Sequence, residues 1–154
     1  MVDGLDGSCR ECLPKWFKSQ IGQRPVPVKE THLTSAVFDQ LRMAMSADPE
    51  GLTGLYRDYL ADAWQSLQSL GESIKQGQVE EVRARAHYLK SSSLVLGAQG
   101  VARQAAVLEE AAAMQDLKNT AKPLAAARTA LRKVQAELAE RLGGGVHPAD
   151  KTAA

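Results

Sequence analysis

The sequence predicts an all-α protein, an antiparallel four-helix bundle preceded by one additional short helix. Hydrophobic residues make up 44% of the 154-residue chain but aromatic residues only 5%, a composition typical of helices packed on helices. Between residues 34 and 142 the apolar residues recur every three or four positions. No segment of the sequence shows the alternation of a half-buried strand, so we expect no β-sheet.

The first two predicted helices begin at residues that stabilise a helix N-terminus. Thr34 or Ser35 can accept a hydrogen bond from a free backbone N–H, and a short helix should run from there to about residue 46. Asp48 is a good N-cap and Pro49 suits the first helical position, so a long helix should follow to about residue 76. The residues expected to face inward are Val37, Leu41, Ala44, Met45, Leu60, Ala63, Leu67, Leu70 and Ile74.

Three further helices are expected over residues 78–96, residues 98–114 and from residue 120 to the glycines at 143–145. Gly97 suits a left-handed position between two of them, because glycine has no Cβ to penalise a positive φ. Pro123 is tolerated because it lies in the first turn of the last helix. The residues expected in the core are Val79, Val82, Ala86, Leu89, Leu96, Val101, Ala105, Leu108, Ala112, Leu124, Ala127, Leu131, Val134 and Leu138.

The two ends of the chain lack this periodicity. Residues 1–33 contain Pro25-Val26-Pro27, which favours extended backbone, and we expect a flexible N-terminal arm there. Residues 143–154 mix Gly, Pro, Lys and Asp, and we expect a disordered tail. The bundle itself is therefore expected to occupy residues 34–142.

Charge, hydropathy and cysteine count exclude several classes of partner. A formal net charge of +1 gives no broad attraction to nucleic acid or to an anionic membrane. No apolar run approaches the roughly 20 residues that span a bilayer, and the N-terminus lacks the order of a signal peptide. Cys9 and Cys12 form a lone Cys-x-x-Cys, which is too few ligands for zinc, so we expect a reduced pair and no metal. We expect a cytoplasmic monomer.

His87 lies in the middle of the helix predicted over residues 78–96. Lys90 follows at i+3 and Ser91 at i+4, so the three side chains share one surface of the helix. The neighbours of the histidine at 86 and 89 take the inward positions, which leaves the imidazole facing solvent. A nucleophilic ring beside a fixed positive charge suits chemistry on a phosphoryl group, and small serines at 91–93 would let another protein approach. A purely structural histidine is the alternative.

This segment resembles the histidine phosphotransfer (HPt) domain family. The family carries Ala-His-x-Leu-Lys-Gly-Ser-(Ser/Ala)-x-x-x-Gly-Ala on a four-helix bundle. This chain has Ala-His-Tyr-Leu-Lys-Ser-Ser-Ser at 86–93 and Gly-Ala at 97–98. The resemblance covers residues 36–142, including Leu-Tyr-Arg-Asp-Tyr-Leu at 55–60 and Leu-Glu at 108–109. Ser91 is a departure, because the family usually has glycine directly after the lysine.

The resemblance implies a histidine phosphocarrier of a two-component phosphorelay. His87 would accept a phosphoryl group from a receiver-domain aspartyl phosphate and pass it to another receiver, with Lys90 and Ser91 supporting the phosphoryl oxygens. The implied partners are response-regulator receiver domains and a (hybrid) sensor histidine kinase. No cofactor is implied, because the receiver supplies the Mg²⁺. The residues expected to contact a docked partner are Arg83, Tyr88, Leu94 and Arg103.

Two other classes of protein do not fit the sequence, and a third remains an alternative. A histidine kinase normally has an acidic residue after its histidine and a glycine-rich phosphate loop, whereas this chain has Tyr88 and no such loop, so we expect no kinase activity. A di-metal bundle needs Glu-x-x-His pairs, and residue 84 is alanine. The alternative left open is a non-phosphorylated adaptor that binds a receiver or a kinase, in which His87 could be replaced without consequence.

Overall fold

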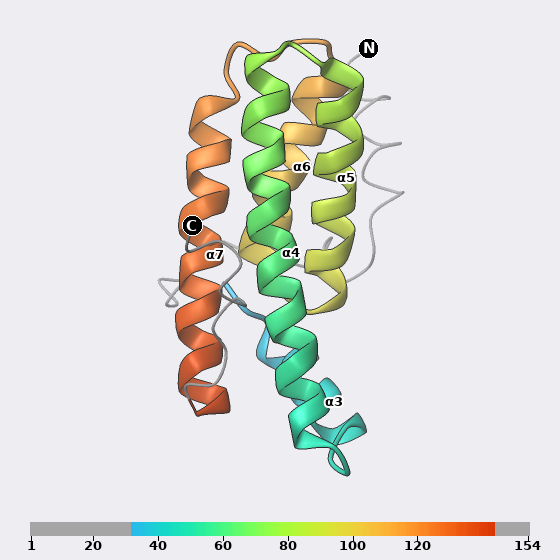
Figure 1. The fold of residues 1–154 in the computed structure, drawn as a ribbon, viewed down its shortest axis with the longest axis vertical. Coiled ribbons are helices and arrows are strands. Elements are labelled where there is room, and N and C mark those ends of the chain that lie inside the picture. Colours follow the sequence, from blue (N-terminus) through green and yellow to red (C-terminus); the bar gives the residue numbers. More distant parts are fainter. Residues whose placement is uncertain (1–31, 144–154) are drawn as a thin grey trace, which may run out of the picture. The chain divides into compact units, whose positions relative to one another are not determined.

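The computed structural model describes residues 32–143, which form five helices and no strand. The helices are α3 (Ser35–Ala44), α4 (Pro49–Lys75), α5 (Val79–Val95), α6 (Gln99–Ala113) and α7 (Ala121–Leu142). Figure 1 shows α4 to α7 as an up-and-down bundle, with α3 at one end. The predicted all-α class and the additional short helix are confirmed. The predictions for the N-terminal arm, including Cys9 and Cys12, and for the C-terminal tail lie outside the described residues, apart from residues 32, 33 and 143.

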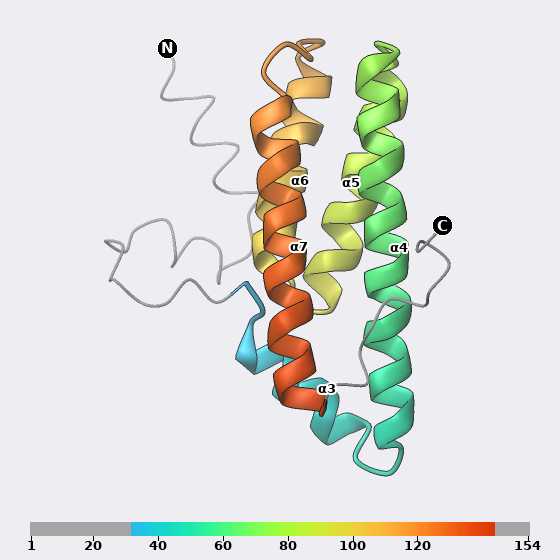
Figure 2. The same cartoon turned by 60° about the vertical axis from the view of Figure 1, so that its left-hand side comes forward.

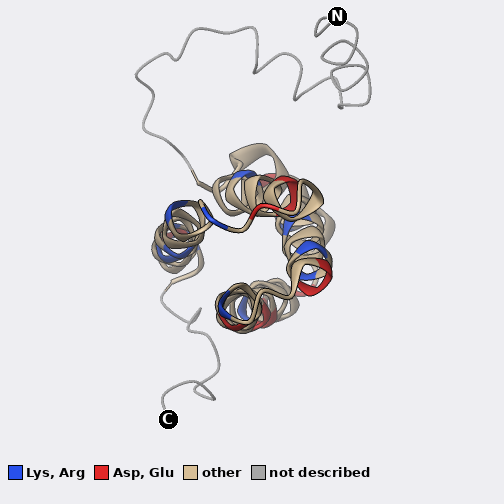
Figure 3. Cartoon of the chain, turned by 90° about the horizontal axis from the view of Figure 1, so that it is seen from above, with Lys and Arg blue, Asp and Glu red and all other residues tan. Residues whose placement is uncertain are grey.

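Seen from one end, the four long helices form a ring in the order α4, α5, α6, α7 (Figure 3). The α5–α6 side therefore faces away from the α4–α7 side. The α5–α6 pair packs most closely, because small side chains line its contact; those that are buried include Ala86, Ala102, Ala105 and Ala112. None of the described helices is long and apolar enough to cross a membrane.

The predicted apolar seams form the core of the bundle. Leu60, Ala63, Leu67 and Leu70 of α4 are fully buried, and so are most of the predicted residues of α5, α6 and α7. Ile74 and Val79, at the edge of the bundle, are only partly buried against this core. Each leucine side chain taken out of water contributes about 1.5–3 kcal/mol, so these seams are the main source of stability.

Two tyrosines connect α4 to the end of α5. The Tyr56 hydroxyl donates a 3.0 Å hydrogen bond to the Leu96 carbonyl, and the Tyr59 and Ser93 hydroxyls share one of 2.7 Å. Burial raises the pKa of Tyr56 to about 12 and also raises the pKa of Tyr59, so both hydroxyls stay protonated. The expectation that all three serines at 91–93 flatten the surface is wrong, because Ser93 is fully buried and only Ser91 is exposed.

The short helix α3 covers the end of the bundle, where α4 and α7 extend beyond α5 and α6 (Figures 1 and 2). Its one buried residue is Phe38, which lies 5.7 Å from the Tyr56 ring and under the Arg141 guanidinium at 5.1 Å. The predicted inward face of α3 is partly wrong, because Ala44 is exposed, whereas Val37, Leu41 and Met45 are partly buried. A helix that covers the end of a bundle buries a narrower stripe of side chains than a helix that belongs to the bundle.

The start of the domain differs in two details from the prediction. Leu33, which the sequence pattern assigned to the arm, is fully buried in the core. Thr34 is the N-cap of α3, but its side chain makes no capping hydrogen bond; its backbone N–H instead donates to the Gly97 carbonyl at 2.7 Å. The predicted cap at Asp48 is confirmed, because its side chain accepts a 2.9 Å hydrogen bond from the Gly51 N–H.

Gly97 lies in the tight turn between α5 and α6 with a φ of +81°, as predicted. A Cβ at this position would lie 2.9 Å from the Val37 Cβ, so the turn also requires glycine for space. The turn fixes which residues of α5 and α6 lie beside one another.

We predict that Leu131→Ala lowers the free energy of unfolding by about 2–5 kcal/mol, because the fully buried side chain would leave a cavity in the α7 seam. Urea unfolding followed by circular dichroism measures the change. The exposed neighbour Lys133→Ala should change it by less than about 0.5 kcal/mol. Equal effects of the two substitutions would show that α7 is not packed as described.

Candidate functional site

His87 lies on the outward face of α5, midway along the bundle. Its side chain is 62% exposed, whereas Ala86 and Leu89 on the opposite side of the helix are fully buried. The expectation of a solvent-facing ring is therefore met, because the helical period turns the apolar neighbours toward the core. The ring is open to a docking protein.

Glu109 of α6 joins the two basic residues of this face. Its Oε1 lies 2.8 Å from His87 Nδ1, and its Oε2 lies 2.5 Å from Lys90 Nζ. One carboxylate therefore contacts both side chains, and the three form a cluster across the α5–α6 contact. We call His87, Lys90 and Glu109 the histidine cluster.

The register of α5 and α6 brings this cluster together. His87 precedes Gly97 and Glu109 follows it at nearly equal distances along the chain, so the antiparallel pair places them at the same level. Leu108, the residue before Glu109, is fully buried. The buried alanines along this contact let the backbones approach, so the short carboxylate side chain reaches the ring.

Glu109 is charged at neutral pH. Its partial burial on its own would raise the pKa of the carboxyl group, but hydrogen bonds from Lys90 and His87, the charge of Lys90 and that of His87 when its ring is protonated more than offset this and lower the pKa. A charged carboxylate only accepts hydrogen bonds, so Nδ1 of the neutral ring must be the donor. The lone pair of the neutral imidazole is then on Nε2, the nitrogen not bonded to Glu109.

Arg83, Ser91 and Leu94 lie on the same outward face of α5 as His87. Ser91 is exposed one turn after the histidine, and Arg83 is exposed one turn before it. Leu94 is 39% exposed two turns after it. Val95 was not singled out from the sequence, but it is 70% exposed beside Leu94 and extends the apolar part of this face.

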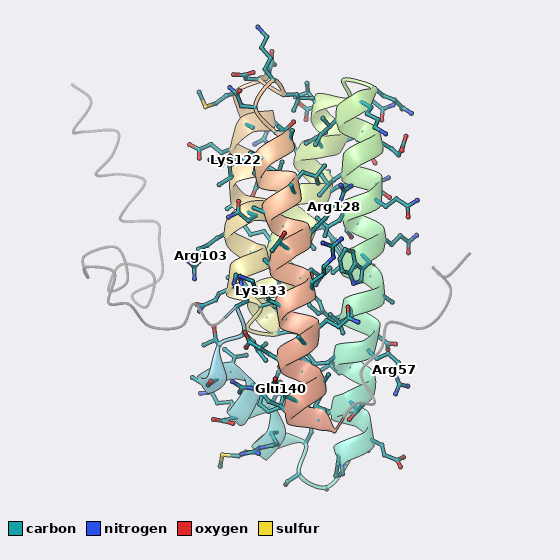
Figure 4. The ribbon with its side chains drawn as sticks, turned by 90° about the vertical axis from the view of Figure 1, so that its left-hand side faces the viewer. Arg57, Arg103, Lys122, Arg128, Lys133 and Glu140 are labelled. Carbon is teal, nitrogen blue, oxygen red and sulfur yellow. The ribbon has the colours of Figure 1, made fainter. Side chains whose placement is uncertain are left out.

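Tyr88 and Arg103 lie at the margins of this surface. Tyr88 is exposed, and its hydroxyl is hydrogen-bonded to Asp62 of α4, which raises the pKa of the tyrosine. Arg103 points outward from α6 (Figure 4). It makes no ion pair with the histidine cluster among the described residues, because its separation from Glu109 places the two on different faces of α6.

Arg85 faces the groove between α4 and α5 and does not join His87. It forms a 2.7 Å ion pair with Glu81 one turn earlier, and the groove it lines is otherwise polar. Between residues 32 and 143 no group of three or more His, Cys, Asp or Glu side chains could hold a metal ion.

The fold and the site define a class: a helical bundle that presents one exposed histidine, held by a carboxylate, on its surface. Residues 54–141 match the model of the Hpt domain family, and the chain belongs to this family. It is thus a histidine phosphotransfer protein of two-component phosphorelays. The comparison with curated proteins found no match.

A solved structure shows the same fold. It is the histidine-containing phosphotransfer protein B (HptB) from Pseudomonas aeruginosa PAO1, with a TM-score of 0.69 and 22% sequence identity. The alignment covers 75% of this chain and 97% of that chain. At this identity the likeness concerns the arrangement of the helices.

We predict that the stabilising effect of Glu109 depends on pH. Because its pKa is lowered on folding, its contribution is present above the unfolded value of about 4.3 and is lost as the pH falls through the folded pKa. Wild type should exceed Glu109→Gln in unfolding free energy at pH 5.5, and the difference should shrink as the pH is lowered to 3. Urea unfolding at each pH measures it.

The exposed neighbour Glu110 provides the matched control, because it forms no ion pair within the described region. Glu110→Gln should show no comparable pH-dependent difference from wild type. A Glu109→Gln difference that stayed constant between the two pH values would contradict the charged cluster.

Proposed function

We propose that His87 is the phosphoacceptor of this protein. It would take the phosphoryl group from an aspartyl phosphate on one response-regulator receiver domain and pass it to another. The observation that carries the proposal is the exposed ring held through Nδ1 by Glu109, which leaves Nε2 as the available nucleophile. The histidine also stands at the matching position of the family pattern at residues 86–98.

The reaction uses Nε2 of the neutral ring. Its lone pair attacks phosphorus in line, an N–P bond forms, the P–O bond to the receiver aspartate breaks, and the aspartate leaves as a carboxylate. Positive charge develops on the imidazole as the bond forms. The Nδ1–H bond to the Glu109 carboxylate stabilises that charge and fixes the direction of the ring.

Lys90 and Ser91 would support the phosphoryl oxygens. Lys90 is held at Glu109 on the same side of α5 as His87, where its ammonium group offsets negative charge on an incoming phosphoryl group. Ser91 has its hydroxyl exposed one turn after the histidine, where it can donate a hydrogen bond. The serine side chain is larger than the usual glycine, so it also restricts which partner loops can approach.

The docking surface for a receiver domain would be the outward face of α5 around His87. Leu94 and the adjoining Val95 supply exposed apolar area close to the histidine. Tyr88 borders it on the α4 side and Arg83 on the other end of the helix, where a basic side chain complements an acidic receiver pocket. Arg103 would lie at the rim of the interface.

We predict that His87→Gln abolishes phosphotransfer, because glutamine offers no nucleophilic ring nitrogen. Purified receiver domains from the same organism, labelled on aspartate, are incubated with wild type and variant. Label on the wild type that survives base, is lost in acid and is absent from the variant is the expected result. ATP alone should label neither protein.

The His87→Gln variant should remain folded, because an exposed ring contributes little to stability. Its circular dichroism spectrum and urea midpoint should match those of the wild type to within a small shift. A wild-type protein that stays folded and takes no label from any receiver would contradict the proposal. It would favour an adaptor that binds without being phosphorylated.

We predict that Glu109→Ala slows phosphotransfer by about 10- to 100-fold. A hydrogen bond to a charged group is worth about 1.5–3 kcal/mol, and about 1.4 kcal/mol corresponds to a factor of ten in rate. Stopped or quenched time courses with one receiver measure the rate. Glu109→Gln, which retains an acceptor for Nδ1–H, should lie between wild type and Glu109→Ala, and Glu110→Ala should be unaffected. Equal rates in all four proteins would remove Glu109 from the mechanism.

A further inference from the structure

The α4–α7 side of the bundle lies opposite the histidine cluster and takes no part in the proposed function (Figure 3). Its centre holds Arg128 and Arg132, one turn apart on α7, with Trp64 facing them from α4. Figure 4 shows this side, with Arg128 reaching from α7 toward α4. We call Trp64, Arg128 and Arg132 the arginine face.

Packing on α4 holds both guanidinium groups in place. The Arg128 Nη2 lies against Gly71, where a Cβ would be only 3.2 Å away, so glycine leaves the space that the guanidinium occupies. The Arg132 guanidinium lies over the Trp64 ring, 5.9 Å from its centroid. The ring is itself fixed by a 3.3 Å hydrogen bond from its Nε1 to Gln135.

The positive charges of the arginine face are not neutralised within the described residues. Neither arginine forms an ion pair there, because the ion pairs of this region involve other basic residues. The helical period explains this, because the positions of α4 and α7 that face one another carry no Asp or Glu. Those on α4 include Arg57, Gln68, Gly71 and Lys75, and those on α7 include Ala121, Ala125, Gln135 and Ala139.

We propose that the arginine face binds an acidic protein segment that presents two carboxylates about one helical turn apart. Residues four apart on a helix are separated by about 6 Å along its axis, so two such carboxylates match Arg128 and Arg132. Guanidinium and carboxylate groups form paired, charge-assisted hydrogen bonds. Because α4 already holds the two guanidinium groups, binding immobilises less side-chain freedom than it would for unrestrained arginines.

An acidic protein segment fits this face better than a nucleic acid or a membrane does. A nucleic acid duplex needs many phosphate contacts, and a single strand also stacks its bases on open aromatic rings. Trp64, however, is partly buried and its ring is covered by Arg132. An anionic membrane is recognised by clusters of about four to eight basic residues. The arginine face has two such residues, Arg128 and Arg132, which is too few for a membrane site of this kind.

The test uses a fluorescein-labelled helical peptide with glutamates at i and i+4, and fluorescence anisotropy as the readout. The wild-type chain should bind the peptide. The affinity should fall as the salt concentration rises from about 50 to about 300 mM, because salt screens the attraction between exposed charges. The double variant Arg128→Gln/Arg132→Gln should bind at least about tenfold more weakly. The same peptide with glutamine in place of glutamate should not bind.

Lys122 and Lys133 provide the matched control, because they lie on a different face of α7 (Figure 4) and replacing them also removes two positive charges. Lys122→Gln/Lys133→Gln should bind the peptide within about twofold of wild type. Equal loss in both double variants, or no binding by the wild type, would overturn the proposal. Tighter binding of a DNA duplex or of phosphatidylserine vesicles than of the peptide would also overturn it. Phosphotransfer to His87 should be unchanged in both variants, which separates this test from that of the proposed function.

Discussion

The close approach of α5 and α6 is the constraint on which the site depends. Small buried side chains along this contact, with the left-handed turn at Gly97, fix the distance and the register of the two helices. That register puts the Glu109 carboxylate beside His87 and Lys90. A larger side chain at Ala105 or a shifted turn would leave the histidine exposed but without its partner, and the ring would lose its fixed direction.

The other helices stabilise the α5–α6 pair in different ways. Tyr56 and Tyr59 of α4 bond to the last turn of α5 and so hold the helix that carries the histidine. The short helix α3 packs at the end of the bundle where α4 and α7 extend beyond α5 and α6 (Figure 2), and its Phe38 closes that end of the core. The described interior is thus mainly apolar, with the hydroxyl groups of both tyrosines hydrogen-bonded inside it, while the charged groups of the histidine cluster lie on the α5–α6 surface.

The sequence predicted the helices and their buried faces well, because strong 3–4 periodicity over long segments leaves one way to form a core. The family pattern around His87 also pointed to the site. The sequence does not predict the role of Glu109, although Leu-Glu at 108–109 is part of the family resemblance, because periodicity assigns faces to single helices and does not align two of them. The sequence pattern did not predict the burial of Phe38, which contacts the end of the bundle, or of Ser93, which a tyrosine of the neighbouring helix α4 covers.

The central claim is that Glu109 holds His87 in the tautomer that leaves Nε2 free to react. Long-range ¹H–¹⁵N NMR spectra of the histidine side chains distinguish the two neutral tautomers directly. At a pH where the ring is neutral, the account predicts that Nδ1 of His87 carries the proton in the wild type, and that this preference weakens in Glu109→Ala. A proton on Nε2 in the wild type, or identical spectra for the two proteins, would contradict it.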